Sequence, residues 1–97
     1  MISKKVTIVN AMGFHMRPAM CFANAMAKYP CDVTIGVNGL TTDGKSIMNI
    51  IAACIKCGME IEISCDGERE EEALKEAVTM VAGGFGEFDA KYKADLQ

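Results

Sequence analysis

The sequence predicts an α+β fold, a two-layer open-faced sandwich in which three helices cover one face of a four-stranded antiparallel sheet. Three segments alternate apolar and polar residues with the period of a strand, and a short fourth strand is expected after the hairpin signal Asn38-Gly39. Between the strands, apolar residues recur with the period of a helix. The elements follow the order β-α-β-β-α-β-α, and 97 residues are enough for one domain.

The first strand is expected over residues 4–10, with Val6 and Ile8 on one face. A helix is expected over residues 18–28, because proline suits the first turn of a helix and Tyr29-Pro30 disfavours its continuation. Met20 lies away from the predicted core stripe, which consists of Ala19, Phe22, Ala23 and Met26.

The middle of the chain predicts a hairpin followed by a short helix. Residues 32–37 alternate as a strand, and residues 40–42 form the returning strand. Ser46 is a good N-cap for a helix that reaches about residue 53. This helix has more apolar side chains than one buried stripe needs, so we expect some to stay exposed and Ile50 to enter the core.

The last strand is expected over residues 60–65 and the last helix over residues 70–81, ended by Gly83-Gly84. The first two strands, joined by a helix, would lie parallel with the last strand antiparallel between them. Residues 1–85 would form the domain, and residues 86–97 a C-terminal extension that is either frayed or weakly helical. The inward residues would be Ile61, Ile63 and Cys65 of the strand and Leu74, Ala77, Val78 and Val81 of the helix.

Composition excludes several classes of function. The net charge is −3 and the lysines do not cluster, which argues against nucleic acid as a partner. The chain has no apolar run long enough for membrane insertion, and its first residues lack the apolar core of a signal peptide. Five scattered cysteines suit a reducing cytoplasm in which cysteine serves as a small apolar residue.

His15 is the only histidine, and it stands at or just before the predicted start of a helix. That end of a helix attracts anions, and Arg17 adds hydrogen-bond donors that suit phosphate or carboxylate. Gly13 allows close approach of the backbone. The helix terminus and Arg17 both disfavour the imidazolium form, so a neutral, nucleophilic imidazole is expected. The simplest chemistry for this arrangement is a histidine that carries a phosphoryl group.

The segment Gly-Phe-His-Met-Arg-Pro-Ala, residues 13–19, resembles the active-site signature of the histidine-containing phosphocarrier proteins (HPr) of the bacterial sugar phosphotransferase system. A second segment that is similar to the family, Gly-Lys-Ser-Ile-Met, covers residues 44–48. The resemblance extends over about residues 3–85. The chain departs from the family pattern at Met12, Phe14, Met16 and Cys54 and in its longer tail.

The resemblance implies a carrier rather than a turnover enzyme, with no cofactor and no metal. His15 would accept, on Nδ1, a phosphoryl group that enzyme I takes from phosphoenolpyruvate, and would pass it to sugar-specific enzyme IIA domains. Arg17 would stabilise the phosphate, and Ser46 would be a regulatory phosphorylation site. The implied partners also include an HPr kinase/phosphorylase and a transcriptional regulator, and the carrier would be a cytoplasmic monomer.

A second interpretation is an interaction module. The chain would then be a regulatory or adaptor protein that partners recognise mainly by phospho-Ser46, or a carrier for a pathway other than sugar uptake. In either case we expect partners to dock around His15, because exposed methionines adapt to several surfaces. The predicted docking face consists of Met16, Met20, Ile47, Met48 and Ile51. The pair Cys54 and Cys57 forms a CxxC motif, but a structural zinc site needs two more ligands.

Overall fold

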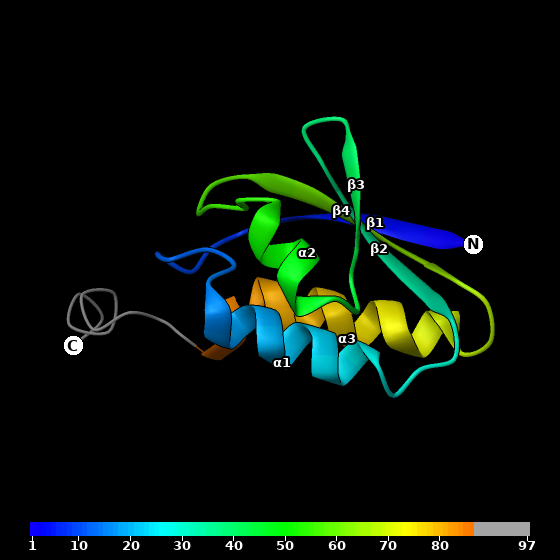
Figure 1. The fold of residues 1–97 in the computed structure, drawn as a ribbon. Helices are drawn as coiled ribbons and strands as arrows, with labels where there is room; N and C mark the ends of the chain where they lie inside the picture. Colours follow the sequence, from blue (N-terminus) through cyan, green and yellow to red (C-terminus); the bar gives the residue numbers. More distant parts are fainter. Residues whose placement is uncertain (87–97) are drawn as a thin grey trace.

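The computed structural model describes residues 1–86, and these form the predicted α+β sandwich (Figure 1). Residues 87–97, most of the predicted extension, lie outside the described residues. The elements in chain order are β1 (Ile2–Thr7), α1 (Met16–Met26), β2 (Asp32–Val37), β3 (Leu40–Asp43), α2 (Ile47–Ala52), β4 (Glu60–Asp66), α3 (Glu70–Ala82) and a short 3₁₀ turn (Gly84–Gly86).

The four strands form one sheet in the order β1-β4-β2-β3, and each neighbouring pair is antiparallel. β4 therefore lies between β1 and β2, as the sequence predicts. Ile63 pairs with Lys4 on one side and with Ile35 on the other. The turn between β2 and β3 has positive φ at both Asn38 and Gly39, which is the conformation of a type I′ hairpin turn. All three helices lie on the same side of the sheet (Figure 1).

The core lies between the sheet and the helices. The predicted stripe of α1 is fully buried, and so are the predicted inward residues of β4 and Ile50 of α2. On α3 the buried line runs through Ala73, Ala77 and Val81, whereas Leu74 and Val78 are only partly buried. The two small alanine side chains of this line let α3 approach the sheet closely. Apolar periodicity alone placed Leu74 and Val78 in the core and did not indicate that Ala73 lies there.

The bounds of β1 and α1, the two elements that flank the loop containing His15, differ from the predicted ones. β1 starts at Ile2 rather than residue 4 and ends at Thr7, because its ladder with β4 ends at the pair Thr7 and Glu60. Ile8 continues irregularly: its N–H donates to Met59 O and its carbonyl accepts from Gly58 N–H, at 2.9 and 2.8 Å. α1 begins at Met16, two residues earlier than predicted.

The cysteines do not all behave as small apolar residues. All five are free thiols, but only Cys31 and Cys65 are buried, and the remaining three are exposed. Burial is the main reason that the pKa of the Cys65 thiol rises to about 11, with Cys31 adding to the shift. Within residues 1–86, no helix has the length and apolar character needed to cross a membrane.

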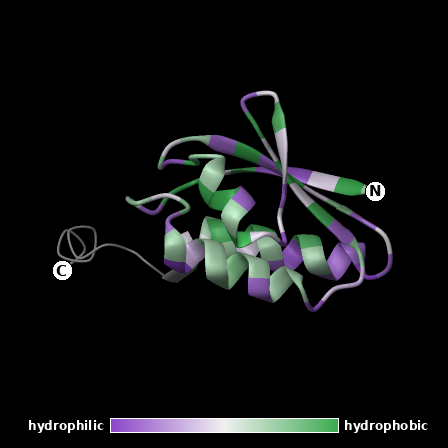
Figure 2. Cartoon of the chain, in the orientation of Figure 1, coloured by the Kyte–Doolittle hydropathy of each residue, from purple (hydrophilic) through white to green (hydrophobic). Residues whose placement is uncertain are grey.

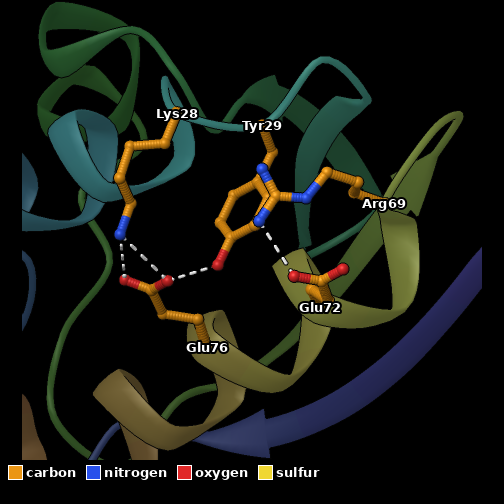
Figure 3. Close-up of polar contacts among 5 residues, drawn as sticks. All are labelled: Lys28, Tyr29, Arg69, Glu72 and Glu76. Atoms are coloured by element: carbon orange, nitrogen blue, oxygen red, sulfur yellow. Dashed lines mark hydrogen bonds and ion pairs between the residues drawn. The ribbon is translucent and has the colours of Figure 1, made fainter.

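A polar cluster joins the end of α1 to α3 (Figure 3). The Tyr29 hydroxyl donates to Glu76, and Lys28 Nζ lies 3.2 Å from the same carboxylate. The Arg69 guanidinium lies 4.9 Å from the centre of the Tyr29 ring and is 2.9 Å from Glu72. The hydrogen bond from Tyr29 is the main reason that the pKa of the Glu76 carboxyl is lowered. The cluster therefore holds the two helices together most strongly when Glu76 is ionised.

Removing the Tyr29 hydroxyl should weaken this connection in a pH-dependent way. Because the pKa of Glu76 is lowered in the folded state, its contribution is present above the unfolded pKa of about 4.3 and is lost as the pH falls through the folded pKa. We expect Tyr29→Phe to lower the Tm by roughly 5 °C at pH 7 and by clearly less at pH 3, measured by circular dichroism. Glu60→Gln, at an exposed carboxylate of β4, is the control and should show no such difference. Equal losses at both pH values would contradict this account.

Candidate functional site

His15 is the N-cap residue of α1, with an extended backbone at ψ −170°. Its N–H donates to Gly13 O, and its carbonyl accepts from Ala19 N–H, each at 3.0 Å. The imidazole makes no capping hydrogen bond to the helix and is half-buried. The first-turn N–H groups of a helix have no carbonyl partner inside it, so residue 15 stands at a helix end whose donors suit an anion.

Gly13 fixes how the loop approaches this helix terminus. Its φ of +63° favours glycine, and a Cβ at this position would lie 2.4 Å from the carbonyl oxygen of Ile55. The next residue, Phe14, donates its N–H to the same oxygen at 3.0 Å. The loop is thus pressed against the connection between α2 and β4, which the sequence did not link to His15.

Phe14 anchors the loop from within. Its side chain is buried, its ring meets Phe22 edge-on with centroids 5.5 Å apart, and the Phe85 ring lies 5.0 Å away. The larger ring at this position, a departure from the family pattern, therefore fills the core next to α1 and the turn after α3. Aromatic pairs of this kind add to the stabilisation that burial provides.

The charges around the helix terminus favour an anion. Arg17 occupies the first turn of α1 and is exposed, and that turn contains no acidic residue. Pro18 is buried in the same turn, where its missing N–H removes no helical hydrogen bond. His15 and Arg17 thus lie at the same end of α1, as the sequence predicts, where the helix dipole favours an anion.

Ser46 is the N-cap of α2, and its hydroxyl accepts a hydrogen bond from Asn49 N–H at 3.3 Å. The preceding residue, Lys45, donates from Nζ to Tyr29 O at 2.6 Å, which ties the start of α2 to the end of α1. α2 packs against α1, so the two motif segments lie on neighbouring helices (Figure 1). Ser46 is half-buried.

The predicted docking residues divide into two groups. Met16, Met20 and Met48 are exposed, by 56, 43 and 71%, whereas Ile47 and Ile51 are half-buried and pack on the core. Figure 2 shows that α2 is mostly hydrophobic along its length. Met12, in the loop before His15, is 71% exposed and was not part of the predicted face. Its place in a loop gives no periodic signal that could have revealed it.

The CxxC pair lies just after α2, with both cysteines exposed and Cys54 in the left-handed region at φ +54°. Among the described residues, no three His, Cys, Asp or Glu side chains are grouped as metal ligands would be.

Comparison with known proteins identifies relatives over almost all of the described chain. The family model described as "PTS HPr component phosphorylation site" matches residues 2–82. Phosphocarrier protein HPr of Pseudomonas aeruginosa is 36% identical over 84 residues, which cover 86% of this chain and 93% of that protein. The crystal structure of HPr from Thermoanaerobacter tengcongensis has a TM-score of 0.86 and 30% identity, covering 89% of this chain and 97% of that one. HPr from Bacillus anthracis gives a TM-score of 0.79 and 32% identity, with 82 and 95% coverage.

The close approach at Gly13 generates a prediction about stability. Gly13→Ala must strain φ and also displace the backbone at Ile55, so it should cost roughly 2–4 kcal/mol of unfolding free energy. Gly39→Ala is a matched control, since φ there is +79° but no atom lies within 4 Å of an added Cβ. It should cost about 1–2 kcal/mol. Urea unfolding of both variants measures the difference, and equal costs would contradict the role of the close contact.

Proposed function

This chain belongs to the HPr family of phosphocarriers of the phosphotransferase system, and we propose that His15 is the residue that takes up and passes on the phosphoryl group. The donor in this proposal is enzyme I, charged by phosphoenolpyruvate, and the acceptors are sugar-specific enzyme IIA domains. The carrier acts as a monomer in the cytoplasm. The observation that carries the proposal is the position of His15 as the N-cap of α1 in a chain of this family.

The proposed step is an exchange of bonds at phosphorus. The lone pair of an imidazole nitrogen forms the N–P bond while the bond from phosphorus to the donor atom breaks, and that electron pair leaves with the donor. Transfer to the acceptor reverses the roles. The phosphoryl oxygens would lie by the first-turn N–H groups of α1 and by Arg17. An exposed arginine and a helix terminus give a moderate stabilisation, which suits a group that must leave again.

We further propose that Ser46 is a regulatory phosphorylation site for an HPr kinase/phosphorylase, and that a transcriptional regulator reads the product. The proposal is supported by the resemblance of residues 44–48 to the family and by the position of Ser46 beside exposed Met48. A phosphate there would add close to two negative charges to the face that meets partners. Acidic partners would then bind more slowly, because like charges oppose their approach.

The docking face in this proposal consists of the exposed Met16, Met20 and Met48, with Ile47 and Ile51 at its base. Its flexible methionine side chains suit a carrier that must fit at least two partners in turn. The half-buried isoleucines join this surface to the core, so they contribute contact area without large losses of side-chain freedom.

The labelling pattern tests the phosphorylation sites. We expect phosphoenolpyruvate and enzyme I to place an acid-labile phosphoryl group on His15, because phosphoimidazole hydrolyses in acid. His15→Ala should abolish this label, and Arg17→Gln should lower the transfer rate by roughly 10–100-fold.

ATP and the kinase should place an acid-stable label that is lost in Ser46→Ala. Mass spectrometry after mild acid separates the two labels, and acid-labile label on His15→Ala would overturn the assignment.

A double substitution tests the docking face. Met48→Asp with Ile51→Asp should raise the KM of the carrier for enzyme I by more than tenfold, because two carboxylates would face an apolar contact. Leu40→Asp is the control, since Leu40 is 71% exposed in β3, outside α1 and α2. Thermal unfolding of each variant establishes that it is folded. An unchanged KM in a folded double variant would remove these residues from the interface.

A further inference from the structure

We propose that Asn10 is a positioning residue for phosphoryl transfer, because its side-chain amide holds in place the loop that presents His15. The inference rests on the proposed function and adds a residue to it. Asn10 is 3% exposed and lies five positions before the histidine, just after the end of β1. A buried amide in a surface loop is costly unless it is hydrogen-bonded, so its contacts define its role.

The amide closes a turn of four residues. Asn10 Nδ2 donates to Gly13 O at 2.7 Å, while Gly13 N–H donates back to the main-chain carbonyl of Asn10 at 3.0 Å. The same Gly13 oxygen also accepts the N–H of His15 at 3.0 Å. One carbonyl therefore receives both the Asn10 side chain and the main chain of the proposed phosphoryl acceptor. Asn10 and His15 are connected through this single atom.

The burial of Asn10 follows from its neighbours. Gly84, in the turn after α3, lies so close that a Cβ there would be 3.7 Å from Asn10 Cβ. On the other side of the turn, Gly13 lies against Ile55. The amide is thus enclosed between two parts of the chain that are far apart in sequence, and water has little access to compete for its bond to Gly13.

The hydrogen bond from Asn10 to Gly13 fixes the position of the His15 backbone, from which the imidazole extends. The His15 carbonyl is held by Ala19 in α1, and its N–H is held by Gly13 O, whose own position depends on Asn10. Without the amide, the loop would sample more conformations, and the imidazole would be aligned with the donor for a smaller share of the time. The docking helices would be unchanged. The expected defect therefore lies in kcat rather than in KM.

Two substitutions of Asn10 test the inference. Asn10→Asp keeps the shape but its ionised carboxylate cannot donate, and Asn10→Ala removes the group. We expect each to lower the kcat of phosphorylation by enzyme I roughly tenfold or more, with KM within about twofold. Asn38→Asp makes the same amide-to-carboxylate change in the β2–β3 turn, where it should leave both parameters unaltered.

Nuclear magnetic resonance supplies a readout that does not depend on transfer. In the unsubstituted protein, a scalar coupling across the hydrogen bond should join Asn10 Nδ2 to the Gly13 carbonyl carbon. The amide proton of His15 should exchange faster in both variants. Absence of the coupling, or normal kcat in a folded variant, would overturn the inference. A protein that takes no label on His15 would overturn the proposed function instead, and the coupling and exchange would still decide whether Asn10 holds the loop.

Discussion

The contact of Gly13 with the Ile55 carbonyl is the constraint on which the site depends. A glycine with positive φ brings two segments so close that no other side chain fits between them, and the N–H of Phe14 bonds to the same oxygen. The connection between α2 and β4 is itself bonded to Ile8 at the end of β1. The sheet therefore positions this connection, which positions the loop, which in turn places His15 at the start of α1.

The helices contribute the polar groups of the candidate site, and the sheet and its connections hold these helices in place. α1 provides a terminus that attracts anions, with Arg17 in its first turn and a stripe of small and aromatic side chains beneath it. α2 is only six residues long and depends on its cap at Ser46 and on buried Ile50 for its stability. In the proposed function His15 is the nucleophile, and its position at the N-terminus of α1 lets both donors and acceptors reach it.

Much of the fold could be predicted from the sequence because its signals are local. The Asn38-Gly39 turn, the alternation in β2 and β4 and the stripe of α1 each depend on neighbouring residues alone. The parts that could not be predicted depend on distant partners. The end of β1 is set by where β4 begins, the exposure of Cys54 by the path of the chain after α2, and the bond of Asn10 by the shape of its loop. The helix-end positions of His15, Arg17 and Ser46 could be predicted because caps and helix starts have sequence signals. The contact of Ile55 with the loop has no such signal.

The cluster around Tyr29 lies at the opposite end of α1 from His15. Eleven residues separate the two ends, a distance of about 16 Å along the helix axis. Effects of substitutions that far apart usually add independently. Mutations in the cluster can therefore adapt the protein to a hotter or colder environment without altering the proposed transfer at His15, so thermal adaptation and phosphoryl transfer can evolve separately in one small domain.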